Sequence, residues 1–224
     1  MKKIFLIGDS EALISELSEL LKEKSEICDE LDDKVDIVFE LTYYDREMKF
    51  KILNFIESKN PSCVIVSNSL CITALEQASE ISSPENLAGI SLYPGFSSAK
   101  AIEISSTKFT DAQKIESIKD LFTSGGKQIL VSPDKPGLIA MRIITLIINE
   151  AYLVLQEGTS NREDIDTAMK LGTNYPYGPI EWSEKLGIDL VYKIIESMFH
   201  EFGEDRYRIT PLLKEKYLEG MISK

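Results

Sequence analysis

The sequence predicts an α/β protein in which a shortened, Rossmann-like parallel sheet is followed by an all-helical domain. Up to residue 132, short apolar runs alternate with segments of helical periodicity, and from residue 138 onward every long segment has helical periodicity. A chain of 224 residues is long enough for two domains that each bury a core. The Pro-punctuated connection "SPDKPG" separates the two patterns. We therefore place the boundary near Asp134 and predict domains at 1–134 and 135–224.

The predicted sheet begins with "KKIFLIG", which ends in Gly8 and precedes a helix whose leucines recur on one face. Further strands are expected at 35–41, 62–68, 88–94, 101–106 and 127–132, and helices at 45–58, 71–81 and 111–123. Because strands and helices alternate, we expect a parallel sheet with helices on its faces. Only the ten residues 25–34 separate the first helix from the strand at 35–41, so the usual second strand is expected to be missing.

The second part of the chain is predicted to be a set of helices joined by turns. Residues 138–156 are apolar nearly all round, which indicates a helix buried in the core or at a subunit interface. Ser160 and Glu163 have the spacing of a capping box, so the next helix is expected to begin there and to end at Gly172. The following "YPYGP" cannot be helical, because its prolines lack amide donors. Helices are expected to resume near Ile180, Asp189 and Pro211.

The charge and the cysteines narrow the class of protein. Lys and Arg number 25 against 37 Asp and Glu, and a net charge of −12 repels nucleic acid and anionic membrane surfaces. The longest apolar stretch, 138–148, is shorter than the roughly 20 residues that span a bilayer, so no membrane segment is expected. The cysteines are odd in number and lack CxxC spacing, and no signal peptide is recognised. We expect a cytoplasmic protein without a metal site.

Several segments resemble the 3-hydroxyacyl-CoA dehydrogenase family. The match is strong from Asp134 to Leu218, where "INEAYLVLQEG", "DIDTAMKLG" and "YPYGP" occur in the family's order, and "DRYRITPLLKEKYL" resembles its closing segment. The N-terminal part is similar to the family's nucleotide domain in "DIVFELTYYDREMKFKIL", "VSNSLCIT" and "GISLYPGFSSAKAIEI". Matching positions in these three segments include Asp36, Glu40, Asp45, Glu47, Lys49, Ser69, Leu70, Ile72, Thr73, Gly89, Lys100 and Glu103.

The resemblance implies a reaction, a cofactor and a partner. The family oxidises L-3-hydroxyacyl-CoA to 3-oxoacyl-CoA in fatty-acid metabolism, with NAD as the hydride acceptor and a histidine as the base. It also implies acyl-CoA as a small-molecule ligand and a homodimer formed through the helical domain. A base with a pKa near 7 suits the proton transfer, which explains the use of imidazole.

At the catalytic positions of the family, this chain has two matches and two changes. Glu103 holds the position of the residue that orients the base, and Ser69 matches the serine that meets the substrate hydroxyl, although a capping role is an equal alternative. Ser91 stands at the position of the histidine, and Met141 stands where the family has an asparagine. The single histidine, His200, is interpreted as a surface residue near a helix C-terminus. These changes predict impaired or lost catalysis.

The cofactor side is also altered. A dinucleotide fingerprint needs three glycines so that the backbone can approach the pyrophosphate at a helix N-terminus. "GDSEAL" keeps Gly8 alone and places Asp9 and Glu11 where negative charge opposes phosphate. Glu40 is either a remnant of the nucleotide site or a charge at the end of a strand. NAD is therefore the cofactor expected from the family, with weakened binding in this chain.

Three functions remain open on the sequence alone. The first is a dehydrogenase of the family with impaired catalysis. The second is a non-catalytic acyl-CoA-binding or regulatory homologue, a pseudoenzyme, that dimerises through its helical domain. The third is an enzyme with a changed cofactor or reaction that uses Ser69, Ser91 and Glu103.

Overall fold

The computed structural model describes residues 1–223 and divides into two compact units, Met1–Leu138 and Ile139–Lys224. The sequence placed the division near Asp134. Asp134 lies in the first unit because its carboxylate accepts hydrogen bonds from the amides of Ala74 and Leu75, both at 2.8 Å. The amide of Gly137 in turn donates to the carbonyl of Leu70 at 2.8 Å. These bonds hold the whole connection against the first unit.

The first unit contains a seven-stranded sheet with the order β2-β1-β3-β4-β5-β6-β7. The strands are β1 (Lys2–Ile7), β2 (Ser25–Ile27), β3 (Ile37–Glu40), β4 (Val64–Asn68), β5 (Leu87–Ile90), β6 (Ala101–Ser105) and β7 (Gln128–Ser132). All neighbouring pairs are parallel except β5 and β6, which are antiparallel. The α/β fold class is confirmed, and the expectation of a parallel sheet holds for every pair but one.

Two features of the sheet differ from the expectation. Only the ten residues 91–100 join β5 to β6, and a parallel crossover needs a dozen residues or more, so the second strand of this pair runs back antiparallel. The prediction that a second strand is missing was wrong, because Ser25–Ile27 forms a short strand beside β1. This strand is too short to flank β1 along its whole length.

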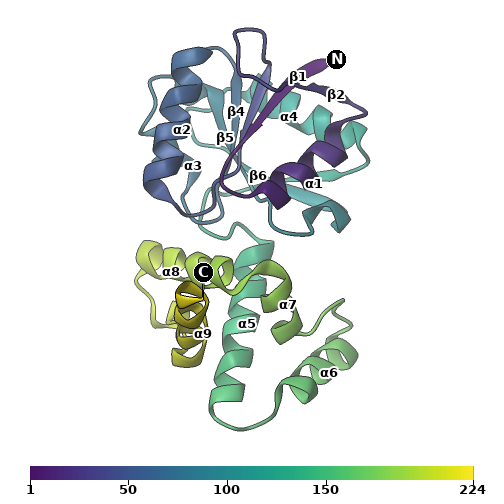
Figure 1. Cartoon of the computed structure of the whole chain (residues 1–224), viewed down its shortest axis with the longest axis vertical. Coiled ribbons are helices and arrows are strands. Elements are labelled where there is room, and N and C mark those ends of the chain that lie inside the picture. Colours follow the sequence, from purple (N-terminus) through teal and green to yellow (C-terminus); the bar gives the residue numbers. More distant parts are fainter. Residues whose placement is uncertain (224) are drawn as a thin grey trace. The chain divides into compact units, whose positions relative to one another are not determined.

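Helices cover both faces of the sheet (Figure 1). The helices α1 (Glu11–Leu21) and α4 (Ala112–Ser124) lie on one face, where the rings of Phe39 and Phe122 meet edge to face at 5.9 Å. The helices α2 (Arg46–Lys59) and α3 (Ala74–Ala78) lie on the other. A side-chain oxygen caps each of the four helices, from Ser10, Asp45, Thr73 and Asp111. Short 3₁₀ turns, Pro84–Asn86 and Phe96–Ser98, complete the unit.

The second unit consists of helices joined by turns and loops, and it has no strand among its described residues. Its helices are α5 (Ala140–Gln156), α6 (Arg162–Thr173), α7 (Pro179–Leu186), α8 (Ile188–Phe202) and α9 (Pro211–Ile222), with a 3₁₀ turn at Asp205–Tyr207. The expected bounds of α6 were wrong at both ends. Asn161 caps its N-terminus by accepting from the amide of Asp164 at 2.9 Å, and the helix continues through Gly172 to Asn174, which takes the left-handed conformation with φ 57°.

The segment after α6 has a structural role. The carboxylate of Asp166 accepts hydrogen bonds from the first amides of α7, those of Ile180 at 2.8 Å and Glu181 at 3.0 Å. A Cβ at Gly178 would lie 2.2 Å from the carboxylate oxygen of Asp166, so only glycine leaves room for this cap. The double-proline turn thus joins α6 to α7, and Asp166 of α6 caps the N-terminus of α7.

Candidate active site

A row of polar side chains crosses the sheet at the carboxyl ends of its central strands. Because alternate residues of a strand share a face, the row lies on the side covered by α2 and α3. Its members are Glu40, Ser67, Ser69, Ser91, Glu103 and Ser105, and each is 6% exposed or less. In open α/β sheets, ligands bind outside the carboxyl ends of the strands. The row therefore contains three of the predicted site residues, Ser69, Ser91 and Glu103, together with Glu40.

Glu40 forms a buried ion pair with Lys49, a residue of α2, and both side chains are fully buried. The Lys49 ammonium also donates to the hydroxyl of Ser67 at 2.9 Å and to the carbonyl of Asn68 at 3.0 Å. The Glu40 carboxylate accepts from the hydroxyl of Ser67 at 2.6 Å and from the amide of Thr42 at 2.8 Å. A charge at a strand end facing solvent would have none of these partners, so Glu40 joins the α2 helix to the sheet.

Ser69 lies beside Gly89 and Ser105 in the same row. Its hydroxyl is 3.4 Å from the hydroxyl of Ser105, which in turn donates to Asp134 at 3.2 Å. A Cβ at Gly89 would lie 2.4 Å from the Ser69 hydroxyl, so glycine leaves space for this contact. Ser69 does not cap α3, because the hydroxyl of Thr73 does so by accepting from the amide of Glu76 at 3.2 Å.

Ser91 and Glu103 face each other across the antiparallel pair of β5 and β6. The amide of Ser91 donates to the carbonyl of Glu103 at 2.9 Å, one step beyond the pairing of Ile90 with Ile104. The Ser91 hydroxyl is buried and has no hydrogen-bond partner among the described residues. A serine hydroxyl has no pKa near neutrality, so this pair cannot take up a proton as imidazole and carboxylate do.

Tyr93 is a further residue near this pair that the sequence did not point to. Burial raises the pKa of its hydroxyl, with smaller contributions from the carboxylates of Glu103 and Glu16. The hydroxyl is therefore protonated at neutral pH. Only the alternation of Ser91 and Tyr93 along an extended segment could have indicated it.

The turn between β1 and α1 is tight. Gly8 has φ +156°, and a Cβ on it would lie 2.8 Å from the carbonyl carbon of Leu41. The hydroxyl of Ser10 accepts from the amide of Leu13 at 3.3 Å and so occupies one of the free amides of the helix N-terminus. Asp9 lies between them, and the pKa of its carboxyl is raised, chiefly by partial burial of that group and further by the negative charges of Glu40 and Asp45.

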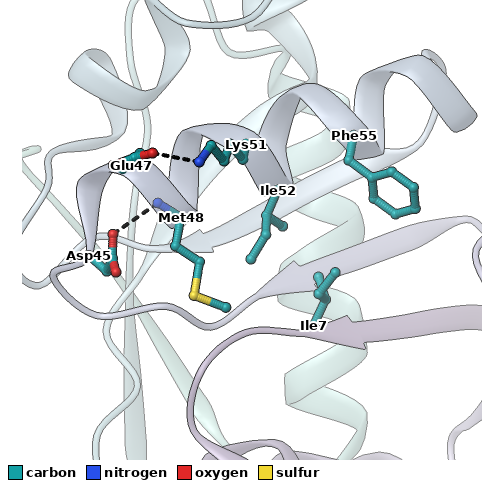
Figure 2. Close-up of a pocket in the computed structure, with 7 residues that line it drawn as sticks. All are labelled: Ile7, Asp45, Glu47, Met48, Lys51, Ile52 and Phe55. Carbon is teal, nitrogen blue, oxygen red and sulfur yellow. Dashed lines mark hydrogen bonds and ion pairs between the residues drawn. The ribbon is translucent and has the colours of Figure 1, made fainter.

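An open pocket of about 600 Å³ lies beside this turn, between the end of β1 and α2. Figure 2 shows Ile7 from β1 opposite Met48, Ile52 and Phe55 from α2. Asp45, Glu47 and Lys51 complete the lining. Asp45 accepts from the amide of Met48 at 2.9 Å, and Lys51 donates to Glu47 at 2.5 Å (Figure 2).

Other reactive groups do not form a second site in residues 1–223. No group of three or more His, Cys, Asp or Glu side chains is arranged to hold a metal ion within that range. Burial raises the pKa of the Cys63 thiol to about 11, so it is not a thiolate nucleophile. His200 is exposed at the last turn of α8. None of the helices described in residues 1–223 has the length and hydropathy needed to cross a bilayer.

Comparison with protein families matches both units. Residues 9–135 match the 3-hydroxyacyl-CoA dehydrogenase NAD binding domain, and residues 137–224 match the 3-hydroxyacyl-CoA dehydrogenase C-terminal domain. The chain belongs to the 3-hydroxyacyl-CoA dehydrogenase family. NAD is the cofactor of this family, and the recognition made from the sequence is confirmed.

The relatives of this chain are named as dehydrogenases of the same kind, and the matched part of this chain covers only a portion of their length. The chain is 45% identical to 3-hydroxyadipyl-CoA dehydrogenase of Escherichia coli over 93 residues, 42% of this chain and 20% of the relative. It is 33% identical to 3-hydroxybutyryl-CoA dehydrogenase of Bradyrhizobium diazoefficiens over 196 residues, 86% of this chain and 67% of the relative. The crystal structure of M. tuberculosis FadB2 superposes with a TM-score of 0.87 at 18% identity, covering 98% of this chain and 94% of that one, which shows the shared fold.

The cofactor turn of this family member does not fit a pyrophosphate. The turn has Gly8 but no second or third glycine, Ser10 occupies one amide, and Asp9 adds negative charge where the phosphates would approach. The strand β2 ends opposite Ile4, while β1 continues to Ile7. At about 3.3 Å per residue, the paired part of β2 therefore ends roughly 10 Å before the end of β1, where a ribose would lie.

Proposed function

We propose that this chain is a member of the 3-hydroxyacyl-CoA dehydrogenase family whose dehydrogenase activity is lost or strongly reduced. One observation carries the proposal: Ser91, whose buried hydroxyl has no partner, stands opposite Glu103 at the position of the family's base. Glu103 remains, but there is no imidazole for it to orient. Removal of a general base alone typically costs about 10²–10⁴ in rate.

Weakened NAD binding is the second part of the proposal. The family fold is retained, so the general position of the dinucleotide is retained with it. The single glycine, the occupied amide at Leu13 and the carboxylate of Asp9 each oppose a pyrophosphate. Loss of the base and loss of phosphate contacts act on the same reaction, so their costs multiply.

A non-catalytic acyl-CoA-binding or regulatory homologue is the alternative, and the helical unit supports it. An apolar groove of about 400 Å³ lies between α5 and α6 and includes Ile147, Val154 and Met169. An uncovered apolar groove on one unit favours association with another chain. We propose a homodimer formed there and a cytoplasmic location, in keeping with cysteines that are odd in number and lack CxxC spacing.

The test is a side-by-side assay of NADH-dependent acetoacetyl-CoA reduction. The relative from Bradyrhizobium diazoefficiens serves as the active control. We expect turnover by this chain to lie at least about 10²-fold below that of the relative. Comparable turnover would contradict the proposal. Binding of acetoacetyl-CoA without turnover would favour the acyl-CoA-binding homologue.

A further inference from the structure

Among residues 1–223, another helix, α3, lies beside α2 on one of its two flanks (Figure 1). On the flank toward α3, Arg46 pairs with Glu76, and Glu57 accepts hydrogen bonds from the amides of Ser82 and Ser83 at 2.9 and 2.7 Å. The opposite flank carries Met48, Ile52 and Phe55, which lie in the open pocket (Figure 2). Met48 and Phe55 are 37% and 42% exposed, an unusual state for apolar side chains on a helix that packs on a sheet.

The open flank follows from the connection between β2 and β3. Parallel strands are normally joined by a crossover helix that packs on the sheet beside the next helix. Here the nine residues 28–36 join β2 to β3 without a helix. The pairing of β2 with β1 also ends at Ile4, so Phe5 and Ile7 are only half-buried. The end of β1 and the flank of α2 together form the two sides of a groove, and no helix covers this groove in residues 1–223.

The apolar side chains on the α2 side of the groove have the spacing that allows a second helix to pack there. Met48, Ile52 and Phe55 occupy positions i, i+4 and i+7 and form a ridge along α2. A second helix packs beside such a ridge when its own side chains fit the neighbouring groove. Ile7 forms the floor opposite this ridge (Figure 2). An amphipathic helix places a matching apolar stripe into such a groove.

The charged side chains at one end of the groove are mainly acidic. Asp45 and Glu47 line the pocket where α2 begins, and Asp9 lies close enough to Asp45 for that carboxylate to contribute to its raised pKa. Lys51 is paired with Glu47, and Lys59 lies over the ring of Phe55 at the far end, 6.0 Å from its centroid. The acidic end favours cationic side chains on whatever covers the groove.

We propose that this groove binds an amphipathic helix of a partner protein, with basic residues placed against the Asp9, Asp45 and Glu47 end. The helix takes the place that a crossover helix occupies in a full parallel sheet. A second copy of this chain is not the proposed occupant, because the homodimer is assigned to the separate groove between α5 and α6. The groove lies apart from the Ser91 and Glu103 pair but beside the Gly8 turn, so this inference rests on the weakened NAD binding proposed above.

A designed peptide tests the proposal on the intact chain. The probe is a labelled peptide of about 18 residues, or ~5 helical turns, with leucines at i, i+3, i+4 and i+7 and lysines on both flanks. A second peptide carries glutamates in place of the lysines. Fluorescence anisotropy should show binding of the lysine peptide that weakens as salt is raised, and weaker or no binding of the glutamate peptide.

Two variants locate the binding. Phe55→Glu should weaken binding of the lysine peptide by about tenfold or more, because it places a charge in the groove. Phe109→Glu is the matched control, since Phe109 is 50% exposed on a loop of the same unit, and it should leave binding unchanged. Circular dichroism should show that both variants are folded.

Several outcomes would overturn the proposal. These are no binding of the lysine peptide, equal binding of both peptides, and equal loss in the Phe55→Glu and Phe109→Glu variants. Sedimentation of the chain without peptide gives a further check. If the chain self-associates and Phe55→Glu abolishes this, a second copy occupies the groove and the partner helix is excluded.

Discussion

At the scale of single residues, the buried pair of Glu40 and Lys49 could be predicted only in part. The sequence places Glu40 at the end of a strand and matches both residues to the family. It cannot show that Lys49, on a helix nine residues later, turns inward to meet the carboxylate, because that contact depends on how α2 packs. Breaking such a pair leaves one charge buried without compensation.

Substitution of Glu40 by Gln should therefore destabilise the chain by about 3–5 kcal/mol, as measured by urea unfolding. Glu47→Gln is the matched control, because the exposed pair of Glu47 and Lys51 contributes about 0.5 kcal/mol or less. The double variant Glu40→Gln with Lys49→Met should recover much of the loss, since no charge is then left buried. If Glu40→Gln lowered the free energy of unfolding no more than Glu47→Gln does, the pair of Glu40 and Lys49 would not be as buried as described.

Asp9 gives a prediction about pH. Its pKa is raised in the folded chain, so the folded state binds the proton more tightly than the unfolded state and stability falls as the pH rises through the raised pKa. Asp9→Asn removes this loss. The variant should be more stable than the natural chain at pH 7 and equal to it below about pH 3.9, where the carboxyl is protonated in both states.

The gain in Asp9→Asn is expected to be small, because Asp9 is an exposed residue and solvent screens its interactions. Thermal unfolding at several pH values measures it. Asp29→Asn, at an exposed carboxyl after β2, controls for the change in net charge. A variant less stable than the natural chain at pH 7 would contradict the direction of the shift.

At the scale of elements, periodicity predicted most strands and helices, and the errors are the bounds of α6, the missed strand β2 and the direction of β6. The sequence indicated a capping box at Ser160, but Asn161, one residue later, is the side-chain acceptor that caps α6. It also indicated an end at Gly172, but Asn174 adopts the left-handed conformation that ends the helix. The direction of β6 depended on the length of a loop. Competing caps and loop lengths are decided by tertiary packing, which periodicity does not contain.

Two glycines of the α6–α7 segment should respond in opposite ways to alanine. Gly178→Ala places a methyl group against the carboxylate of Asp166 and should destabilise the helical unit by about 2–3 kcal/mol. Gly172→Ala meets nothing within 4 Å on an exposed helix face and should stabilise it by about 0.5–1 kcal/mol. Urea unfolding of both variants checks this. Equal effects would refute the role of Gly178 in the cap of α7.

At the scale of the whole molecule, the family and the two-part architecture could be predicted from sequence motifs, whereas the groove beside α2 could not. The short segment 25–34, between the first helix and the strand at 35–41, was visible as a count of residues, and it was interpreted as a missing strand. Its actual consequence, an uncovered flank on α2, becomes visible only when the chain is folded. The change at Ser91 and the absence of the glycines that should follow Gly8 were visible in the sequence, because both fall at positions fixed by the motif.

The proposed dimer should depend on the groove between α5 and α6. Val154→Glu places a charge in that groove and should shift the chain from dimer to monomer in sedimentation velocity runs. Met221→Glu, at a 53% exposed position of α9, is the control and should leave the dimer intact. A chain that is monomeric before any substitution, or a dimer that survives Val154→Glu, would remove this groove as the interface.

The central claim is that this family member has lost the means to run the dehydrogenase reaction, at the base and at the cofactor turn alike. Calorimetric titration with NADH tests it most directly, with the Bradyrhizobium diazoefficiens relative as the control. The account predicts no saturable binding up to about 1 mM, which corresponds to less than roughly 4 kcal/mol of binding free energy. Micromolar binding that tightens when acetoacetyl-CoA is added would contradict it.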